Sequence, residues 1–190
     1  MEIKKELFNV ATQKYTKEDI TKKYNEGKNM SFLFFWKTSK QNLDKGCFSQ
    51  WQESYFTVEN VDYFCTEQFM MAYKADLFND LDALEKILNS NHPKEIKKLG
   101  RTIKNFNESI WNENKYSIVL TGNYHKFNQN TAMKNILLET QNKIIVEASP
   151  YDKIWGVALS ESDKTINNPN NWKGENLLGF SLMEVRDMLS

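Results

Sequence analysis

The run TEQFMMAYKA, from Thr66 to Ala75, constrains the fold most because it predicts a helix that is apolar on nearly every side. Met70, Met71 and Phe78 would lie along one stripe, and apolar or aromatic side chains fill most of the remaining circumference. A helix of this kind must be buried in a core. We expect Thr66 to be its N-cap, since a threonine oxygen can accept a hydrogen bond from an unpaired backbone N–H.

Two charged residues, Glu67 and Lys74, interrupt this apolar helix. Residues seven apart lie on nearly the same face, about 10 Å apart along the axis. Charges on a buried helix must be paired or face a cavity, because desolvating either one alone is costly. A partly desolvated lysine has a lowered pKa and could act as an amine nucleophile. Periodicity alone favours a structural alternative, in which Lys74 extends to solvent and Glu67 interacts with the helix dipole.

Length and composition indicate one globular domain without a charge bias. The chain has 190 residues, 40% of them hydrophobic, which is enough for a substantial core. Lys plus Arg and Asp plus Glu both number 25, so nucleic acid could be bound only through a local patch. No run approaches the roughly 18 apolar residues of a membrane-spanning helix. These features predict a cytoplasmic protein in which Cys47 and Cys65 are free thiols.

The pattern along the chain predicts an α+β fold that is mainly helical, as a single compact domain with a small β-sheet. Residues 1–31 are expected to be an N-terminal appendage or cap, with a short helix ending at Gly27, and residues 32–190 the domain. We expect a hairpin from Tyr55–Val58 and Asp62–Phe64, a clear strand at Lys143–Ala148 and a weaker one at Lys153–Leu159. Further helices are expected at Leu81–Asn89, Pro93–Ile103, Asn107–Tyr116 continuing into Ser117–Asn123, Asn128–Glu139 and Leu177–Leu189, with a loop at Asn167–Asn176.

Most histidine-based and nucleotide-loop chemistry is excluded. Only His92 and His125 are present, and no zinc-ligand spacing, HExxH helix, G-x-S-x-G elbow, P-loop or dinucleotide fingerprint occurs. A Cys-His nucleophile pair stays open, although a lone cysteine in an aromatic setting is usually a small core residue. Catalysis would therefore depend on carboxylates, lysine, arginine and hydroxyls. We expect neither a metal nor a cofactor.

A second polar group follows the clearest strand. Glu147 and Asp152 flank the turn at its end, where catalytic groups are common, and Trp155 could stack on a heterocyclic base. Equally, Trp155 could belong to the core while Asp152 fixes the turn. Arg101, just after a glycine, suits a phosphate because the guanidinium fork matches phosphate oxygens, but a structural role is equally open.

Three other polar residues stay ambiguous for similar reasons. Lys126 and Asn128 precede a predicted helix, where a substrate pocket and a simple N-cap would look alike. Arg186 in the last helix is more typical of a structural ion-pair partner.

Between Cys47 and Leu189 the chain carries a series of blocks in this order: CFSQW, TEQFMMAYKADLFND, KKLGR, KFNQN, LLET, VEASPYDKIWGVAL, NWKGENLLG and LMEVR. This series and its order resemble the NADAR family, and within it the YbiA-like members. Three departures are visible: Gln141 and Ala158 stand where glycine is usual, and Asn60-Val61 replaces a turn pair that often contains glycine. We expect these departures to affect turns more than chemistry.

The resemblance implies hydrolysis of a bond between ribose C1 and nitrogen. YbiA-like members are associated with ribosylamino-pyrimidine phosphates, which are early intermediates of riboflavin biosynthesis, and other members with removing ADP-ribose from guanine bases. It places the family's lysine at Lys74 and its carboxylate at Glu67. A third possibility is a non-catalytic binder of ADP-ribose or nucleotide. Neutral overall charge favours a small-molecule substrate over nucleic acid.

The resulting hypothesis assigns a role to each candidate. Lys74 attacks ribose C1 to give a Schiff base, and Glu67 or Asp152 moves protons and stabilises positive charge at C1. Trp155 stacks on the base or sugar. The candidates for substrate binding, including the serine of the CFSQW block, are Trp155, Ser49, Arg101, Lys126, Asn128 and Glu147.

Overall fold

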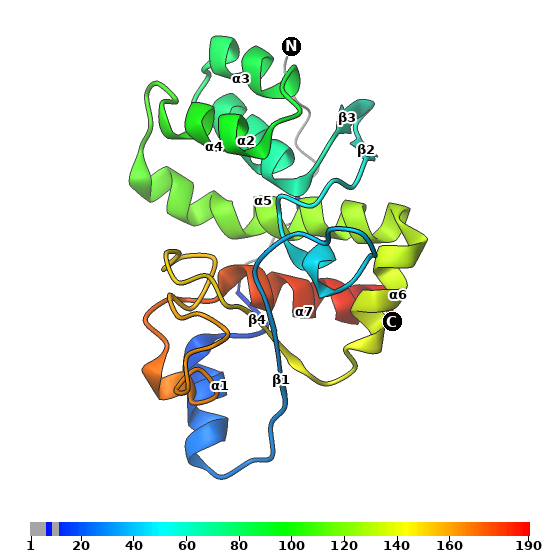
Figure 1. Cartoon of the computed structure of the whole chain (residues 1–190). Helices are drawn as coiled ribbons and strands as arrows, with labels where there is room; N and C mark the ends of the chain where they lie inside the picture. The colour runs from blue at the N-terminus through cyan, green and yellow to red at the C-terminus, as the bar shows by residue number, and fades with distance from the viewer. Residues whose placement is uncertain (1–6, 9–11) are drawn as a thin grey trace. The chain divides into compact units, whose positions relative to one another are not determined.

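Helix α2 (Thr66–Leu77) is packed on several sides by other helices, as its sequence predicts. This computed structural model describes residues 7–8 and 12–190. Residues 7–8 and 50–131 belong to one unit, called unit 1, and residues 12–49 and 132–190 to another, called unit 2. Within the described part the fold is mainly helical with two small sheets, which confirms the expected class (Figure 1).

Unit 1 is organised around α2. The helix contacts α3 (Leu81–Leu88), α4 (Pro93–Arg101) and α5 (Glu108–Gln129), and ten of its twelve residues are buried. Helix α5 is continuous past Tyr116, as the sequence suggested, and extends further to Gln129. The next helix, α6 (Thr131–Glu139), consequently starts later than expected.

The start of α2 differs from expectation. Cys65 is the N-cap and makes no side-chain cap bond, whereas Thr66 is already the first helical residue. The hydroxyl of Thr66 donates to the Gln50 carbonyl at 3.3 Å, and the Glu67 N–H donates to the same oxygen at 2.9 Å. A backbone carbonyl from a distant segment therefore satisfies one of the free N–H groups in the first turn of the helix.

The predicted hairpin is present. Strands β2 (Phe56–Val58) and β3 (Val61–Tyr63) are antiparallel and joined through Glu59 and Asn60, which both have positive φ, at 52° and 63°. Two consecutive left-handed residues are typical of the tight turns whose twist suits a hairpin. The hairpin packs on α5 and contributes aromatic rings to the core of unit 1.

Unit 2 contains a parallel strand pair. Strand β1 (Phe32–Phe35) pairs with β4 (Ile144–Glu147), and α7 (Leu177–Leu189) packs against β4. The prediction of β4 is confirmed. Strand β1 was not predicted, because a continuous apolar run of four residues shows no alternation by which a strand could be recognised.

The prediction of a weaker strand at Lys153–Leu159 is wrong. This segment consists of turns and bends, in which the Asp152 side chain accepts the N–H groups of Ile154 at 2.9 Å and Trp155 at 2.8 Å. A carboxylate that caps successive backbone donors holds the chain in a turn and prevents extended pairing. The loop expected at residues 167–176 is found, with the short 3₁₀ helix η2 (Pro169–Asn171) inside it.

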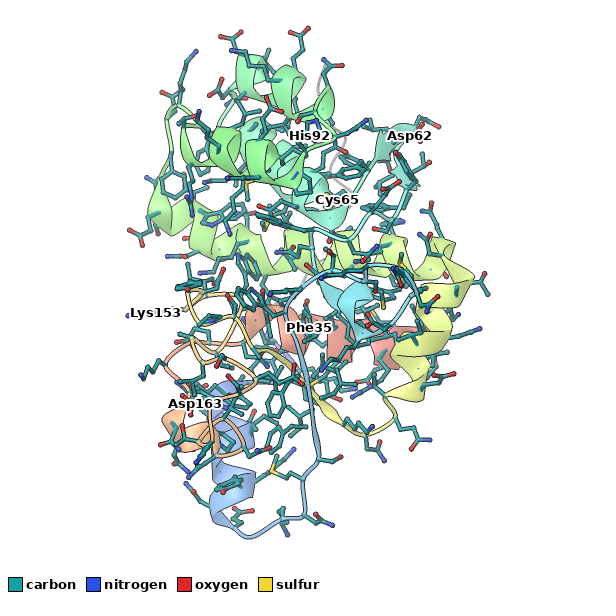
Figure 2. All side chains as sticks on the ribbon, in the orientation of Figure 1. Phe35, Asp62, Cys65, His92, Lys153 and Asp163 are labelled. Atoms are coloured by element: carbon teal, nitrogen blue, oxygen red, sulfur yellow. The ribbon has the colours of Figure 1, made fainter. Side chains whose placement is uncertain are left out.

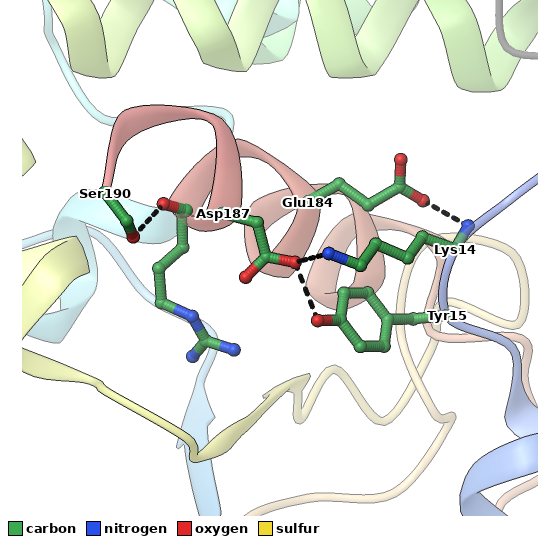
Figure 3. Close-up of polar contacts among 6 residues, drawn as sticks. Lys14, Tyr15, Glu184, Asp187 and Ser190 are labelled. Carbon is green, nitrogen blue, oxygen red and sulfur yellow. Dashed lines mark hydrogen bonds and ion pairs between the residues drawn. The ribbon is translucent and has the colours of Figure 1, made fainter.

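Residues 12–31 of the expected N-terminal appendage make specific contacts within unit 2, whereas residues 1–6 and 9–11 lie outside the described part. Tyr15 donates to Asp187 of α7 at 2.7 Å, and the Lys14 N–H donates to Glu184 at 2.8 Å (Figure 3). Helix α1 (Lys17–Asn25) then packs on η2. The division at residue 31 stays a prediction. None of the described helices is long and apolar enough to cross a membrane.

Candidate active site

Lys74 lies in the last turn of α2, where its amine meets the end of α4. Its Nζ donates to the Gly100 carbonyl at 2.8 Å and lies 4.4 Å from the ring centre of Phe106 and 5.3 Å from that of Trp111. Gly100 packs closely against Met71 of α2, since a Cβ there would come within 1.9 Å of the Met71 sulfur. The amine is therefore held in a half-buried aromatic setting.

Burial lowers the pKa of the Lys74 amine, and the negative charge of Glu67 partly opposes that change. The faces of the two neighbouring rings stabilise the ammonium form, but they replace only part of the stabilisation that water would give to the charge. A lysine in this setting has a larger neutral fraction near pH 7 than an exposed one. This is the property that an amine nucleophile requires.

Glu67 lies in the first turn of the same helix and is 3% exposed. Its position is fixed by the backbone bond to the Gln50 carbonyl. The spacing of two helical turns places it about 10 Å along the axis from Lys74. Glu67 therefore acts on the lysine through its charge, and a direct role in proton transfer requires a substrate or water between them.

Arg101 follows Gly100 and is exposed, so its backbone adjoins the carbonyl that the Lys74 amine contacts. Lys126 in α5 has a different environment. It is 0% exposed, and its Nζ lies 5.2 Å from the ring centre of Phe127. Asn128 lies two residues further along the helix and is exposed. In unit 1, Lys74 and Glu67 thus share helix α2, and Arg101 is the sequence neighbour of the Gly100 that the Lys74 amine contacts.

The remaining candidates lie in unit 2. Asp152 caps the turn described above, which supports the structural alternative considered for it. Trp155 lies in that turn and is partly exposed, and Glu147 is the last residue of β4. Ser49 is buried and directly follows the 3₁₀ helix η1 (Lys45–Phe48). Their roles toward a substrate stay predictions.

The cysteine alternative loses support. Cys47 and Cys65 are not joined in a disulfide bond, as predicted, and both are buried. Burial raises the pKa of the Cys65 thiol to about 12, so the thiolate that a nucleophile needs is not formed near neutral pH. Figure 2 shows Cys65 at the start of α2 and His92 at the start of α4, where His92 is an exposed N-cap residue.

Several residues that shape the site were not singled out from sequence. Phe106 and Trp111 flank the Lys74 amine, although each is only one of many aromatic residues in the chain. Asn176 is fully buried, accepts the Glu147 N–H at 2.9 Å and donates to the Ile145 carbonyl at 2.9 Å. Its position just before a predicted helix was the available signal, since asparagine is a preferred N-cap.

Comparisons with known proteins identify the family of this chain. The model of the NADAR domain matches residues 34–190. N-glycosidase R617 of Acanthamoeba polyphaga mimivirus is 44% identical over 162 residues, which are 82% of this chain and 95% of the relative. The chloroplastic riboflavin biosynthesis protein PYRR of Zea mays is 30% identical over 138 residues, which are 67% of this chain and 20% of that protein.

A solved structure shows the same fold. The NMR structure of the E. coli protein YbiA superimposes with a TM-score of 0.68 at 25% identity, covering 84% of each chain. Relatives matched over most of their length are named N-glycosidases, and this defines the class as hydrolases that act on N-glycosyl bonds. The chain belongs to the NADAR family of that class.

Proposed function

We propose that this protein hydrolyses the bond between ribose C1 and nitrogen in ribosylamino-pyrimidine phosphates. The observation that carries the proposal is the half-buried amine of Lys74, held by the Gly100 carbonyl between two aromatic rings. The names of two relatives, an N-glycosidase and a riboflavin biosynthesis protein, support the bond type and the substrate class.

The proposed chemistry uses the neutral form of that amine. Nζ of Lys74 attacks C1, a C1–Nζ bond forms, and the bond from C1 to the pyrimidine amine breaks as the departing amine takes up the proton that Nζ loses. The sugar ring then opens: the C1–O4′ bond breaks, the ring oxygen takes up a proton, and C1 and Nζ form a protonated Schiff base. Water then hydrolyses the Schiff base, which releases the phosphorylated ribose and restores the amine. Glu67 stabilises positive charge during the reaction, and Arg101, the last residue of α4, holds the phosphate in this scheme.

Incubation with ribosylamino-pyrimidine phosphate tests the proposal, with release of the free pyrimidine as the readout. We expect turnover by the wild type and a loss of at least about 10²-fold for Lys74→Ala, since a positioned catalytic group typically contributes that much. Lys98→Ala, an exposed lysine of α4, serves as the matched control. Tight binding of substrate without any product would indicate a silent binding module instead.

A second candidate function, removal of ADP-ribose from guanine bases of nucleic acid, is favoured by the charge of α4. This helix carries four cations, Lys94, Lys97, Lys98 and Arg101, and one acidic residue, Glu95. Across residues 7–8 and 12–190, none of the four cations forms an ion pair. Trp51 adds an exposed ring, 5.8 Å from the Lys97 amine, on which a base could stack.

Salt dependence of oligonucleotide binding separates the two functions. If α4 binds a nucleic-acid strand, Lys94→Ala/Lys97→Ala/Lys98→Ala should flatten the plot of log affinity against log salt by about 2, because fewer counterions are released. Lys22→Ala/Lys23→Ala/Lys28→Ala removes the same charge from unit 2 as a control. Equal slopes for both variants would leave the small-molecule substrate as the only one supported.

A further inference from the structure

The turn that carries Trp155 is held by the segment that leads into α7. The carbonyl groups of five consecutive residues, 153–157, each accept an N–H from the segment 173–178. Two of these donors are the first residues of α7: Leu177 donates to the Ile154 carbonyl at 3.2 Å, and Leu178 donates to the Trp155 carbonyl at 3.1 Å. The free N–H groups at the start of a helix are thus used to fix this turn.

The two segments also approach each other closely. A Cβ at Gly174 would lie 2.2 Å from the Gly156 carbonyl oxygen and 2.9 Å from the Cα of Lys153. Glycine leaves the room that such a close backbone approach requires. A displacement of residues 173–178 is therefore transmitted directly to the turn at residues 153–157, because no side chain at position 174 separates the two backbones.

Residues 14–17, which we call the N-terminal strap, contact this segment just before its first donor. The Lys17 amine donates to the Trp172 carbonyl at 2.7 Å. Trp172 is itself well anchored, since it is 3% exposed and its Nε1–H donates to the Ile166 carbonyl at 2.7 Å. The strap thus adds a hydrogen bond at the residue that directly precedes the donors to the turn.

The N-terminal strap also contacts α7 near its C-terminus. The Tyr15 hydroxyl donates to Asp187 at 2.7 Å, and the Lys14 N–H donates to Glu184 at 2.8 Å (Figure 3). The Lys14 amine pairs with the same Asp187 carboxylate, but its side chain is 59% exposed, so this ion pair adds little. Because a helix moves as a rigid element, bonds at this end also restrain its first turn at Leu177.

We propose that the N-terminal strap positions Trp155 for the substrate, with Tyr15 and Lys17 as positioning residues that act through α7 and the Trp172 carbonyl. The strap precedes residues 34–190, which are the part of the chain that the family model matches. The inference deepens the proposed function and rests on the stacking role predicted for Trp155.

The proposal predicts which kinetic constant the strap changes. A ring that is already held in place loses less freedom when a base or sugar stacks on it, so the strap increases affinity for the substrate. Weakening the strap should raise KM and leave kcat nearly unchanged, because stacking contributes equally before and during the chemical step. Lys74→Ala, in contrast, should lower kcat.

Hydrogen exchange followed by mass spectrometry tests the structural step without any substrate. Tyr15→Phe/Lys17→Met removes both side-chain donors and keeps the size of each side chain. We expect the amides of residues 173–178 to exchange about 10-fold faster, because two hydrogen bonds that restrain this segment are lost. The amides of α3 in unit 1 should exchange as in the wild type.

Turnover of ribosylamino-pyrimidine phosphate tests the link to the substrate, at a temperature well below the unfolding of every variant. For Tyr15→Phe/Lys17→Met we expect KM to rise by about 5-fold, which corresponds to roughly one hydrogen bond of ordinary strength. Lys17→Arg keeps a donor for the Trp172 carbonyl and should have the KM of the wild type, whereas Lys17→Met should not.

A double-mutant cycle shows whether the strap acts through Trp155. Trp155→Ala should raise KM by about 10-fold, as expected for the loss of a stacking ring. Adding Tyr15→Phe/Lys17→Met to Trp155→Ala should then raise KM no further, because the ring that the strap positions is absent. A strap that only stabilises the fold would raise KM by the same factor in both backgrounds, and this result would overturn the proposal.

Lys23→Met/Tyr24→Phe is the matched control, since it makes the same two substitutions at exposed positions of α1. The proposal is overturned if this control changes exchange or KM as much as the strap variant does. It is also overturned if residues 173–178 exchange at the wild-type rate in the strap variant. Faster exchange in the strap variant together with no turnover by the wild type contradicts the proposed function, while it still supports the restraint of the turn by the strap.

Discussion

At the scale of single residues, Lys74 combines two effects that act in opposite directions. Desolvation favours its neutral form, whereas the Gly100 carbonyl and the rings of Phe106 and Trp111 stabilise the ammonium. The net effect is a lowered pKa. The buried ammonium lowers the stability of the folded protein at neutral pH, and the same burial makes the amine more reactive as a nucleophile.

This cost predicts how stability depends on pH. Because the folded-state pKa of Lys74 lies below its unfolded value, the unfolded chain binds more protons between the two values, and raising pH through that window stabilises the folded state. Lys74→Met lacks this contribution. The difference in melting temperature, Lys74→Met minus wild type, should therefore be largest near pH 7 and should decrease as the pH approaches 10.5. A difference in melting temperature that does not change with pH would contradict a lowered pKa of Lys74 in the folded protein.

Two positions where the chain departs from the family's glycines have left-handed backbones. Gln141 has φ of 47° and Ala158 of 54°. The left-handed region costs a residue with a Cβ roughly 1–2 kcal/mol, partly offset by the lower flexibility of its unfolded state. The expectation from sequence, that these departures fall on turns, agrees with the structure.

Ala158→Gly should therefore increase the free energy of unfolding by about 0.5 kcal/mol, measured by urea denaturation. Ala132→Gly in helix α6 is the control of opposite sign, since glycine weakens a helix by about 0.5–1 kcal/mol. If both substitutions destabilise the protein, backbone strain at Ala158 is not significant.

At the scale of elements, one asparagine fixes the end of β4 against the start of α7. Asn176 is buried, left-handed with φ of 56°, and bonded to both Ile145 and Glu147. The opposite end of α7 is contacted by Lys14 and Tyr15 through Asp187 (Figure 3). Helix α7 is thus attached at both ends by side chains that come from other parts of unit 2.

Asn176→Ala should lower the free energy of unfolding by about 2–4 kcal/mol, because it leaves two buried backbone groups without partners and puts alanine in a left-handed conformation that asparagine tolerates better. Asn176→Gly keeps the backbone geometry and should lose somewhat less. Asn91→Ala, at an exposed position, should stay within about 0.5 kcal/mol of the wild type. Urea denaturation of the three variants measures the differences, and equal losses for Asn91 and Asn176 would exclude the bridging role.

At the scale of the whole molecule, patterns within one segment were predictable and pairings between distant segments were not. The helix Leu177–Leu189 and the strand around residues 144–147 follow from periodicity and burial. The pairing of β1 with β4 depends on residues more than a hundred positions apart, which no local pattern encodes. Likewise, Lys74 was identifiable, but its contact with Gly100 was not.

The central claim is that Lys74 forms a covalent Schiff base with the ribose, and borohydride trapping during turnover of ribosylamino-pyrimidine phosphate tests it most directly. Borohydride reduces the Schiff base to a stable secondary amine, which peptide mass spectrometry can locate. We predict one adduct, with the mass of the reduced phosphorylated sugar, on the peptide that contains Lys74. Undiminished turnover by Lys74→Ala, or an adduct on another lysine, would contradict the account.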